Sequence, residues 1–515
     1  MASLKRIIKK FWGCWKDKFI IIYGFLIVMF LPIILINKVP GKISMLENRY
    51  LASFPEMYDA SGKYNGNIFQ DGLEEWIDDN IGLRDTWVRI HANVLWKLFS
   101  ISASNQVKVG REGWFFYNNN NNLEIAEGTY PLSEENLYDI DTLQTQITDR
   151  LEKMGVKYVL ILPPSKISVY PEMYHEELGI IDTPDDMIYD SLIQNTDVNA
   201  INLKTVLVDN KNTEQLYFKT DTHWNPKGAY VGFNYIIGEL KEMGLLDDSV
   251  PDISVRWYDT SHQGEFGKMM GDEDLLGIEN MQDLEIDNAR AVELTEGDYY
   301  ESIINEYQND GYNLEQETLH VFTNDSPEVD QRTVVMFGDS MFAGWNLPQL
   351  FAEKYKTFIF VWSHRIDEDF VLNVGADLVL CDCGERFTNS FLNNYETYSK
   401  LLYEPMQNPF GSFVSSNYLD AITMGDNVEI TYINNGTDTW TRGKQVRLGI
   451  FADGRDTGIR AYIKYDAEIK QGDSYTFVIS GDNLSRLQDL DSEDISSTLM
   501  QEGITYFGEM RKLNY

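Results

Sequence analysis

The sequence predicts an α/β fold in which helices flank a parallel sheet, with a transmembrane helix before it and a β-sandwich after it. Three observations lead to this prediction. An uncharged apolar run lies near the N-terminus, buried strands alternate with amphipathic helices through the middle, and residues 411–515 form short alternating strands separated by Gly, Asn and Asp. A chain of 515 residues that is 43% hydrophobic has room for two or three domains.

The N-terminal segment has the features of a membrane anchor. Residues 19–36 carry no charge, and as a helix they would span about 27 Å, close to the hydrocarbon core of about 30 Å. Basic residues dominate residues 1–18, which places the N-terminus in the cytoplasm by the positive-inside rule. No small-residue cleavage site follows, so an anchor is favoured over a signal peptide.

We therefore expect a cytoplasmic basic tail over residues 1–18, a single-pass transmembrane anchor over 19–37 and a juxtamembrane helical segment over 38–100. The rest of the chain is expected on the extracellular or periplasmic side of the cell membrane. The N-terminal helix is the expected contact with the membrane.

Charge and cysteine content exclude some classes of function. The net charge of −38 repels nucleic acid, so DNA or RNA binding is not expected. The cysteines are Cys14, Cys381 and Cys383, and the last two are too close for an unstrained disulfide. Neither a disulfide framework nor a CxxC zinc site is present, so we expect no metal and no cofactor.

The middle of the chain predicts the sheet. "VKYVLILPPSK" is a buried strand that ends at a Pro-Pro turn, and "RTVVMF", "FIFVW" and "DLVLCD" are further strands. Helical patterns such as "AYVGFNYIIGELKEMG" separate them, which indicates a parallel sheet with helices on both faces. We expect this domain over residues 101–410, with a polar insertion of hairpins and loops at about 245–330, and the β-sandwich over 411–515.

The stretch "VVMFGDSMFAG" contains a candidate nucleophile. A strand ends at Phe337, Gly338-Asp339-Ser340 forms a tight turn, and a helical run follows. Parallel α/β sheets place reactive groups at this end of their strands. Backbone N–H groups around Gly338 and Ser340, together with the helix dipole, would stabilise an oxyanion there.

A serine nucleophile needs a base and a carboxylate to orient that base, and "DTHW" supplies both. Asp221 would accept from one imidazole nitrogen of His223 while the other faces Ser340, at about 2.6–3.2 Å. Each signal is weak by itself, because a serine at a helix start is commonly an N-cap. His223 as a core histidine, or the pair as an accidental or metal-site pattern, are the alternatives.

In its motifs the sequence resembles the alginate O-acetyltransferase family (the AlgJ/AlgX and peptidoglycan PatB type) and the related DHHW proteins. The similar stretches are "ENRYLASFP", "GREGWFFY", "GVKYVLILPPSKISVYPE", "YFKTDTHWNPKGA", "VVMFGDSMF" and "ADLVLCDCGERF". This sequence and that family both place the Asp/His pair before the serine, whereas ordinary SGNH hydrolases place the serine first. The resemblance implies an SGNH-hydrolase-like domain.

The resemblance also implies roles for residues and partners. Ser340 would be the nucleophile, His223 the base and Asp221 its orienting partner. The enzyme would acetylate a polysaccharide outside the cell, with acetyl groups supplied by a multi-pass membrane acyltransferase. Arg365 and Lys166 lie in strand-end loops and are candidates for substrate or oxyanion contacts, with a surface salt bridge and a turn as the respective alternatives.

Two further features are less tied to catalysis. "GERF" matches a family motif, and an internal ion pair of Glu385 with Arg386 is the expected role. The C-terminal sandwich resembles the four-tryptophan immunoglobulin-like domain through "NNGTDTW", "VRLG" and "MQEGITYFGE". There we expect Trp440 to be a core residue and not a glycan contact.

The leading hypothesis is a membrane-anchored O-acetyltransferase that works through an acyl-serine intermediate. A glycan O-acetyl esterase would use the same three residues, with water as the acceptor. A non-catalytic scaffold for polysaccharide assembly is the third possibility, against which the intact Asp221, His223 and Ser340 argue.

Overall fold

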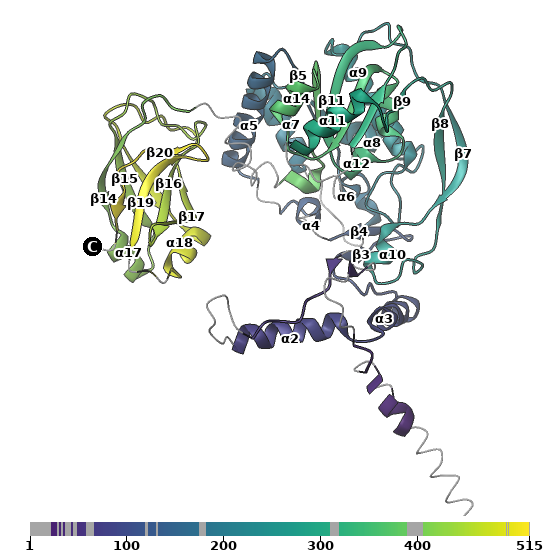
Figure 1. Ribbon diagram of the computed structural model, residues 1–515, viewed down its shortest axis with the longest axis horizontal. Coiled ribbons are helices and arrows are strands. Elements are labelled where there is room, and N and C mark those ends of the chain that lie inside the picture. Colours follow the sequence, from purple (N-terminus) through teal and green to yellow (C-terminus); the bar gives the residue numbers. More distant parts are fainter. Residues whose placement is uncertain are drawn as a thin grey trace, which may run out of the picture.

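The computed structural model describes residues 22–27, 30–31, 34–36, 43–44, 49–57, 66–118, 122–129, 132–174, 182–309, 319–388, 405–490, 492 and 494–513. Within these residues, a seven-stranded sheet forms the centre of the middle region (Figure 1). In spatial order its strands are β6 (Ala200–Asn202), β5 (Lys157–Leu162), β13 (Leu378–Asp382), β11 (Asp330–Gly338), β12 (Tyr355–Trp362), β10 (Leu319–Thr323) and β9 (Val292–Glu293).

The sheet is mixed, which corrects the prediction of a parallel one. The five strands from β6 to β12 pair in parallel, but β10 pairs with both β12 and β9 in the antiparallel sense. Both β9 and β10 lie in the region that the sequence predicted as an insertion. β10 is only partly buried, which suits a strand near the edge of a sheet, and antiparallel pairing is common there.

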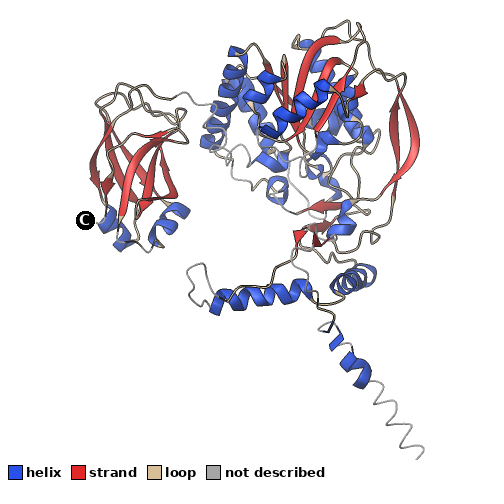
Figure 2. Ribbon diagram, in the orientation of Figure 1, coloured by secondary structure: helices blue, strands red, loops and turns tan. Residues whose placement is uncertain are grey.

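Helices cover both faces of the sheet (Figure 2). Side chains alternate along each strand, so Val334 and Met336 of β11 face one core while Val335 and Phe337 face the other. The first core is closed by α8 (Lys204–Asn210), α9 (Pro226–Glu242) and α13 (Leu347–Ala352). The second is closed by α5 (Glu134–Lys153), α7 (Pro184–Asn195), α11 (Asp298–Asn309) and α14 (Glu368–Asn373).

Three neighbouring parallel strands end at one edge of the sheet, and each is followed at once by a polar turn. β5 leads into α6 (Lys166–Val169), β11 into α12 (Ser340–Ala343), and β13 into a 3₁₀ turn over Glu385–Phe387. Because parallel strands share the direction of their carboxyl ends, these turns gather in one place.

Two hairpins and a short helix border this edge. They are β3 (Val107–Val109) with β4 (Phe115–Tyr117), β7 (Val255–His262) with β8 (Glu279–Ile286), and α10 (Glu265–Met269). Before them lie α2 (Gly66–Asn80), α3 (Arg84–Phe99) and the short pair β1 (Ile43–Ser44) and β2 (Arg49–Tyr50); α4 (Asn122–Ala126) follows β4. Figure 1 shows α2 and α3 on the side from which the N-terminal chain enters.

The C-terminal region is rich in β-structure, as predicted. One antiparallel sheet holds β14 (Gly411–Ser416), β15 (Val428–Asn434) and β18 (Ser474–Ile479). The other holds β17 (Arg455–Tyr462), β16 (Val446–Ala452), β19 (Ile495–Gln501) and β20 (Thr505–Tyr506), with β21 (Arg511–Lys512) paired to β19; the helices here are α17 (Tyr418–Met424) and α18 (Gly481–Gln488). Trp440 is completely buried, in agreement with a core role. The immunoglobulin-like assignment stays a prediction.

Within the described parts of the chain, no helix combines the length and the apolarity needed to cross a bilayer. The predicted anchor over residues 19–37 includes residues 19–21, 28–29, 32–33 and 37, which lie outside the described residues, as does the basic tail over 1–18.

Candidate active site

Ser340 lies where the sequence places it, at the first position of α12, directly after β11. Asp339 is the N-cap, and its Oδ1 accepts a hydrogen bond of 2.7 Å from the backbone N–H of Met341. Asp382, at the end of β13, accepts a 3.0 Å bond from the N–H of Asp339. Neighbouring strand ends therefore hold the turn that presents the serine.

Gly338 has a packing role in this turn. A Cβ added to it would lie 1.9 Å from Oδ2 of Asp382, so only glycine fits against that carboxyl group. Burial raises the pKa of Asp382 well above its usual value, and the neighbouring Asp339 raises it further. The packing against Asp382 explains why this position is a glycine, and the oxyanion contact expected of its backbone stays a prediction.

The fold brings His223 to Ser340 although 117 residues separate them. Nε2 of His223 lies 2.9 Å from the hydroxyl oxygen of Ser340, and Nδ1 lies 2.7 Å from Oδ1 of Asp221. A carboxylate only accepts, so Nδ1 carries the proton and Nε2 is free to accept from the serine. His223 is partly exposed, which separates it from a closed-off core histidine.

Asp221 is buried, and both of its oxygens accept hydrogen bonds. While Oδ1 binds His223, Oδ2 accepts from Nε2 of His262 at 2.9 Å and from the backbone N–H of Glu265 at 3.2 Å. Burial by itself would raise the pKa of Asp221, but the hydrogen bonds from His223 and His262 outweigh burial and hold it well below the usual value. The carboxylate therefore stays ionised beside the imidazole.

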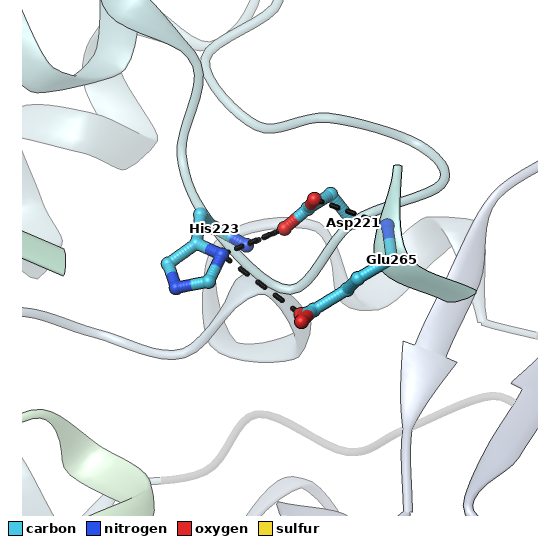
Figure 3. Close-up of side chains that lie close together, drawn as sticks. All are labelled: Asp221, His223 and Glu265. Carbon is cyan, nitrogen blue, oxygen red and sulfur yellow. Dashed lines mark hydrogen bonds and ion pairs between the residues drawn. The ribbon is translucent and has the colours of Figure 1, made fainter. Parts of the chain in front are cut away.

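Glu265 approaches the same imidazole, which raises the question of a metal site (Figure 3). Its Oε1 lies 3.9 Å from Nδ1 of His223 and accepts from the hydroxyl of Thr222. A metal ligand nitrogen binds at about 2.0–2.1 Å, so Nδ1 would first have to release Asp221. These contacts therefore describe a hydrogen-bonded network that orients the ring.

Besides His223, the cationic side chain of Arg386 contacts Ser340. Its Nη2 donates to the hydroxyl oxygen of Ser340 at 3.3 Å, and its guanidinium stacks 4.8 Å from the ring centre of Phe387 and 6.0 Å from that of Tyr117. The sequence predicted an ion pair of Arg386 with Glu385, but the contacts with Ser340, Phe387 and Tyr117 hold the guanidinium in place. This finding places Arg386 in the site itself.

Glu385 instead binds the loop that follows β5. Its Oε2 accepts from the backbone N–H of Ser165 at 2.9 Å and from the hydroxyl of Ser168. Burial raises its pKa, against the lowering effect of these hydrogen bonds. Glu385 thus connects the turn after β13 to α6. The predicted ion pair was wrong because Glu385 binds Ser165 and Ser168 across the sheet edge and not its sequence neighbour Arg386.

Lys166 is buried and has partners other than those expected. Its ammonium donates to the backbone carbonyls of Phe218 at 3.1 Å, Lys219 at 3.2 Å and Asp221 at 2.6 Å. An ammonium has three N–H bonds, and these three carbonyls use them. Lys166 therefore holds the backbone that carries Asp221 and His223. Burial lowers the pKa of Lys166 to about 7, against the opposing effect of nearby carboxylates.

Arg365 lies in the loop after β12, with its side chain 43% exposed and paired to Asp367 at 3.4 Å. This is the surface salt bridge that the sequence left as the alternative. Its neighbour His364 points inward, with Nε2 3.4 Å from Oδ2 of Asp339. The loop therefore contributes to the turn below Ser340 through His364.

A pocket opens beside the nucleophile. It is lined by Phe116, Tyr117, Asn122, Pro163, Pro164, Ser165, Lys166, Ile167, Thr222, Met341, Gly384, Glu385 and Arg386. Its wall thus combines the β3–β4 hairpin with the turns after β5 and β13. Sequence reasoning missed His262 and Glu265, which come from the polar insertion and belong to no motif.

Comparison with known proteins agrees with the resemblance seen in the sequence. A family model described as "SGNH hydrolase-like domain, acetyltransferase AlgX" matches residues 107–302, a segment that includes Asp221 and His223 but ends before Ser340. The probable alginate O-acetylase AlgJ of Pseudomonas syringae pv. tomato is 28% identical over 228 residues, which are 43% of this chain and 53% of that protein. Its counterpart in Pseudomonas aeruginosa is 27% identical over 167 residues, 31% of this chain and 39% of that protein.

Solved structures are similar at lower identity. The O-acetyltransferase domain of Pseudomonas putida AlgJ is 18% identical, with a TM-score of 0.38, and the match covers 55% of this chain and 91% of that one. Bacillus cereus PatB1 is 17% identical, with a TM-score of 0.39, and the match covers 55% and 96%.

The match spans between about two fifths and about half the length of these two AlgJ proteins. The family model and these relatives support a relation of the middle of this chain to the SGNH hydrolase-like acetyltransferases of the AlgX and AlgJ type.

Proposed function

We propose that this chain is a serine-dependent O-acyltransferase that moves an acetyl group onto a polysaccharide outside the cell membrane. The observation that carries the proposal is the row of contacts from Asp221 through His223 to Ser340, with distances of 2.7 Å and 2.9 Å. This arrangement activates a hydroxyl for attack on an acyl carbon.

In the first step, the hydroxyl proton of Ser340 moves to Nε2 of His223 while Oγ attacks the carbonyl carbon of an acetyl donor. The tetrahedral intermediate collapses when the bond to the leaving group breaks, and His223 returns the proton to that group. Asp221 stabilises the imidazolium that forms between these two events. The product is acetyl-Ser340.

Two donors of this chain suit the developing oxyanion. The backbone N–H of Ser340, at the first position of α12, makes no hydrogen bond within the described part of the chain, as is usual for the first turn of a helix. The guanidinium of Arg386 donates to the hydroxyl oxygen of Ser340, so it also lies near the place where the acyl carbonyl group of the donor would come. Donors fixed in place before the reaction stabilise the intermediate without further reorganisation.

In the second step, a sugar hydroxyl gives its proton to His223 and attacks the acetyl carbon. The intermediate collapses, the bond to Oγ breaks, and Ser340 recovers its proton from His223. A glycan acceptor is supported by the names of the relatives, which are described as probable alginate O-acetylases. The glycan of this chain is not specified by that likeness.

The proposal includes a location and a donor system. The apolar run over residues 19–36 and its basic flank favour a single-pass anchor with the N-terminus in the cytoplasm, so that the site faces outward. Acetyl groups made inside the cell must then cross the membrane, which calls for a multi-pass membrane acyltransferase as the partner. The acidic chain makes nucleic acid an unsuitable ligand.

The test is an acyl-enzyme trap. The purified full-length chain is mixed with an activated acetyl ester, quenched in acid and measured by intact-protein and peptide mass spectrometry. We expect one acetyl group on the peptide that contains Ser340, and none in Ser340→Ala. Retention of the adduct in that variant would refute the proposal.

The esterase alternative uses the same first step and differs in the acceptor. With a series of acceptor oligosaccharides, a transferase yields acetylated sugar that increases with acceptor concentration while acetate decreases. Acetate as the sole product at every acceptor concentration would assign the chain to the hydrolases.

A further inference from the structure

Helix α3 has an exposed apolar stripe that the proposed reaction does not use. Trp87, Ile90, Val94 and Leu98 recur at spacings of three and four residues, so they share one face of the helix. Their exposed fractions lie between 42% and 72%. A stripe of large apolar side chains on a helix surface marks an interaction site.

The opposite face of α3 is packed on the catalytic region, so the helix has a fixed orientation. Ala92 is fully buried, and the ring of Trp96 lies 5.2 Å from that of Phe115 in β4. The side chain of Asn93 donates to a carboxylate oxygen of Asp272 at 2.6 Å. These contacts direct the apolar stripe away from the body of the protein.

The predicted anchor ends directly beside α3. A Cβ on Gly82 would lie 2.4 Å from Cβ of Leu35, so Leu35 packs on the backbone of the turn that precedes α3. In the described residues 22–27, 30–31 and 34–35, the large apolar side chains are exposed. Exposed apolar side chains of this number need an apolar environment, and Leu35 places them next to the turn that leads into α3.

We propose that α3 lies in the outer interface of the lipid bilayer, with Trp87, Ile90, Val94 and Leu98 inserted among the acyl chains. This inference rests on the proposed membrane anchoring and adds a second, interfacial contact to it. A helix of 16 residues is about 24 Å long and would sink its apolar face about 5–10 Å. Lys97 is exposed beside the stripe, where its ammonium reaches lipid phosphate.

Such seating would orient the active site. Phe115, against which α3 packs, belongs to the same strand as Phe116 and Tyr117, and these two residues line the pocket beside Ser340. The hairpin thus forms a single layer between the membrane-facing helix and the pocket. A pocket held in this way lies within reach of acetyl groups that emerge from a membrane partner.

The test measures the depth of α3 in a bilayer. The full-length chain carrying Cys14→Ser is reconstituted in vesicles of phosphatidylethanolamine and phosphatidylglycerol, with one nitroxide label at a time through Trp87→Cys, Ile90→Cys, Val94→Cys or Leu98→Cys. Cys381 and Cys383 are buried, and burial raises their thiol pKa values, so they do not take the label.

Collision rates with oxygen, which dissolves in lipid, are compared with those of a water-soluble nickel complex. We expect oxygen to dominate at all four stripe positions. The nickel complex is expected to dominate at Asp85→Cys, an exposed position on another face of α3, and at Tyr258→Cys on β7. The double change Val94→Glu with Leu98→Glu should lower the oxygen collision rate at position 87 severalfold.

Flotation of the vesicles separates this inference from the anchoring on which it rests. A chain that floats with the vesicles but shows nickel access at all four positions is anchored without α3 insertion, which overturns the inference. Low access to both reagents, with dipolar broadening that disappears on dilution with unlabelled chain, would assign the stripe to a second copy and also overturn it. A chain that does not float refutes the anchoring and the inference together.

Discussion

At the scale of single residues, His262 is a site residue that the sequence did not predict. It holds the second oxygen of Asp221 while its ring lies 4.1 Å from that of Phe218. The motif DTH specifies a base and its carboxylate, but nothing in it specifies what fixes the carboxylate. His262 lies 41 residues further along the chain, in a polar hairpin with no recognisable pattern, and only tertiary structure brings it there.

We predict that His262→Ala lowers kcat about tenfold and leaves KM nearly unchanged. Loss of one donor lets Asp221 rotate away from His223, which matters most in the transition state. His262→Gln retains an N–H donor and should recover most of the rate. The check is steady-state kinetics with an acetyl ester and an acceptor sugar.

The matched control is His320→Gln. His320 pairs with Glu293 at 2.6 Å at the far edge of the sheet, so its loss should not change kcat. Equal rates for His262→Ala and the wild type would show that Asp221 needs no second anchor.

Arg386 gives the second prediction at this scale. If its guanidinium stabilises the oxyanion, Arg386→Gln should reduce kcat by about 10²–10³ with little effect on KM. Arg365→Gln is the matched control, because that side chain is 43% exposed and bound to Asp367. A large increase in KM with unchanged kcat would instead assign Arg386 to substrate binding.

At the scale of elements, α6 shows how a buried charge supports a catalytic segment. The sequence placed Lys166 in a strand-end loop and suggested a substrate contact, because the loop lies at the functional edge of the sheet. The structure uses its charge on three backbone carbonyls. Hydrogen bonds from a side chain to the backbone of a distant segment leave no periodic pattern in a sequence, so the sequence could not predict this role of Lys166.

Lys166→Met is predicted to change both activity and pH dependence. The three carbonyls lose their donors, the segment that carries Asp221 and His223 shifts, and kcat should fall about 10- to 100-fold. Between pH 7 and 10.5 the folded chain binds fewer protons at Lys166 than the unfolded chain, because burial lowers its pKa from 10.5 to about 7. Stability therefore gains from this group as pH rises through that window, and the variant should lose that gain.

Lys354→Met is the matched control for this prediction. Burial also lowers the pKa of Lys354, to about 8, and its ammonium donates to the carbonyl of Pro251, away from Ser340. Its variant should lose part of the same pH-dependent gain in denaturant titrations but keep its kcat. Unchanged kcat in Lys166→Met would contradict the positioning role.

The elements themselves were predicted where their patterns are strong. β5, β11 and β13 each contain a continuous apolar run that leads into a turn, which is how buried parallel strands appear in a sequence. β9 and β10 were not predicted, because their short and partly exposed segments resemble the hairpins of an insertion. Edge strands depend on pairing partners far along the chain, and a local pattern does not contain that information.

At the scale of the whole molecule, the candidate site depends on segments from the entire middle region. Ser340 and Arg386 follow strands of the central sheet, while His262 and Glu265 come from the polar region between α9 and β9. The insertion therefore contributes two residues that contact Asp221 in the candidate site. The family model ends at residue 302, so it covers the base and its carboxylate but not the nucleophile, which the sequence motif GDS predicted separately.

The C-terminal β-rich region is connected to this body through α5. Arg442 donates from Nε and Nη2 to the two oxygens of Asp139, each at 2.6 Å, and both side chains are only 11% exposed. Gln146 adds a 3.1 Å bond to the carbonyl of Gly443, and the hydroxyl of Tyr465 donates to Glu134 at 3.0 Å. A bidentate pair with little solvent around it is a strong, directional contact.

We predict that Arg442→Ala uncouples the two parts in thermal unfolding, because it leaves the Asp139 carboxylate buried without its main partner. The C-terminal part should melt first, about 5 °C lower for each kcal/mol lost, and calorimetry should resolve a separate transition. Asp139→Ala should do the same, and the double variant should be no worse than either single one, since the two residues act as a pair. Lys470→Ala removes an exposed pair with Glu468 and serves as the control that leaves the melting curve unchanged. Identical curves for Arg442→Ala and the wild type would mean that the two parts unfold independently of this contact.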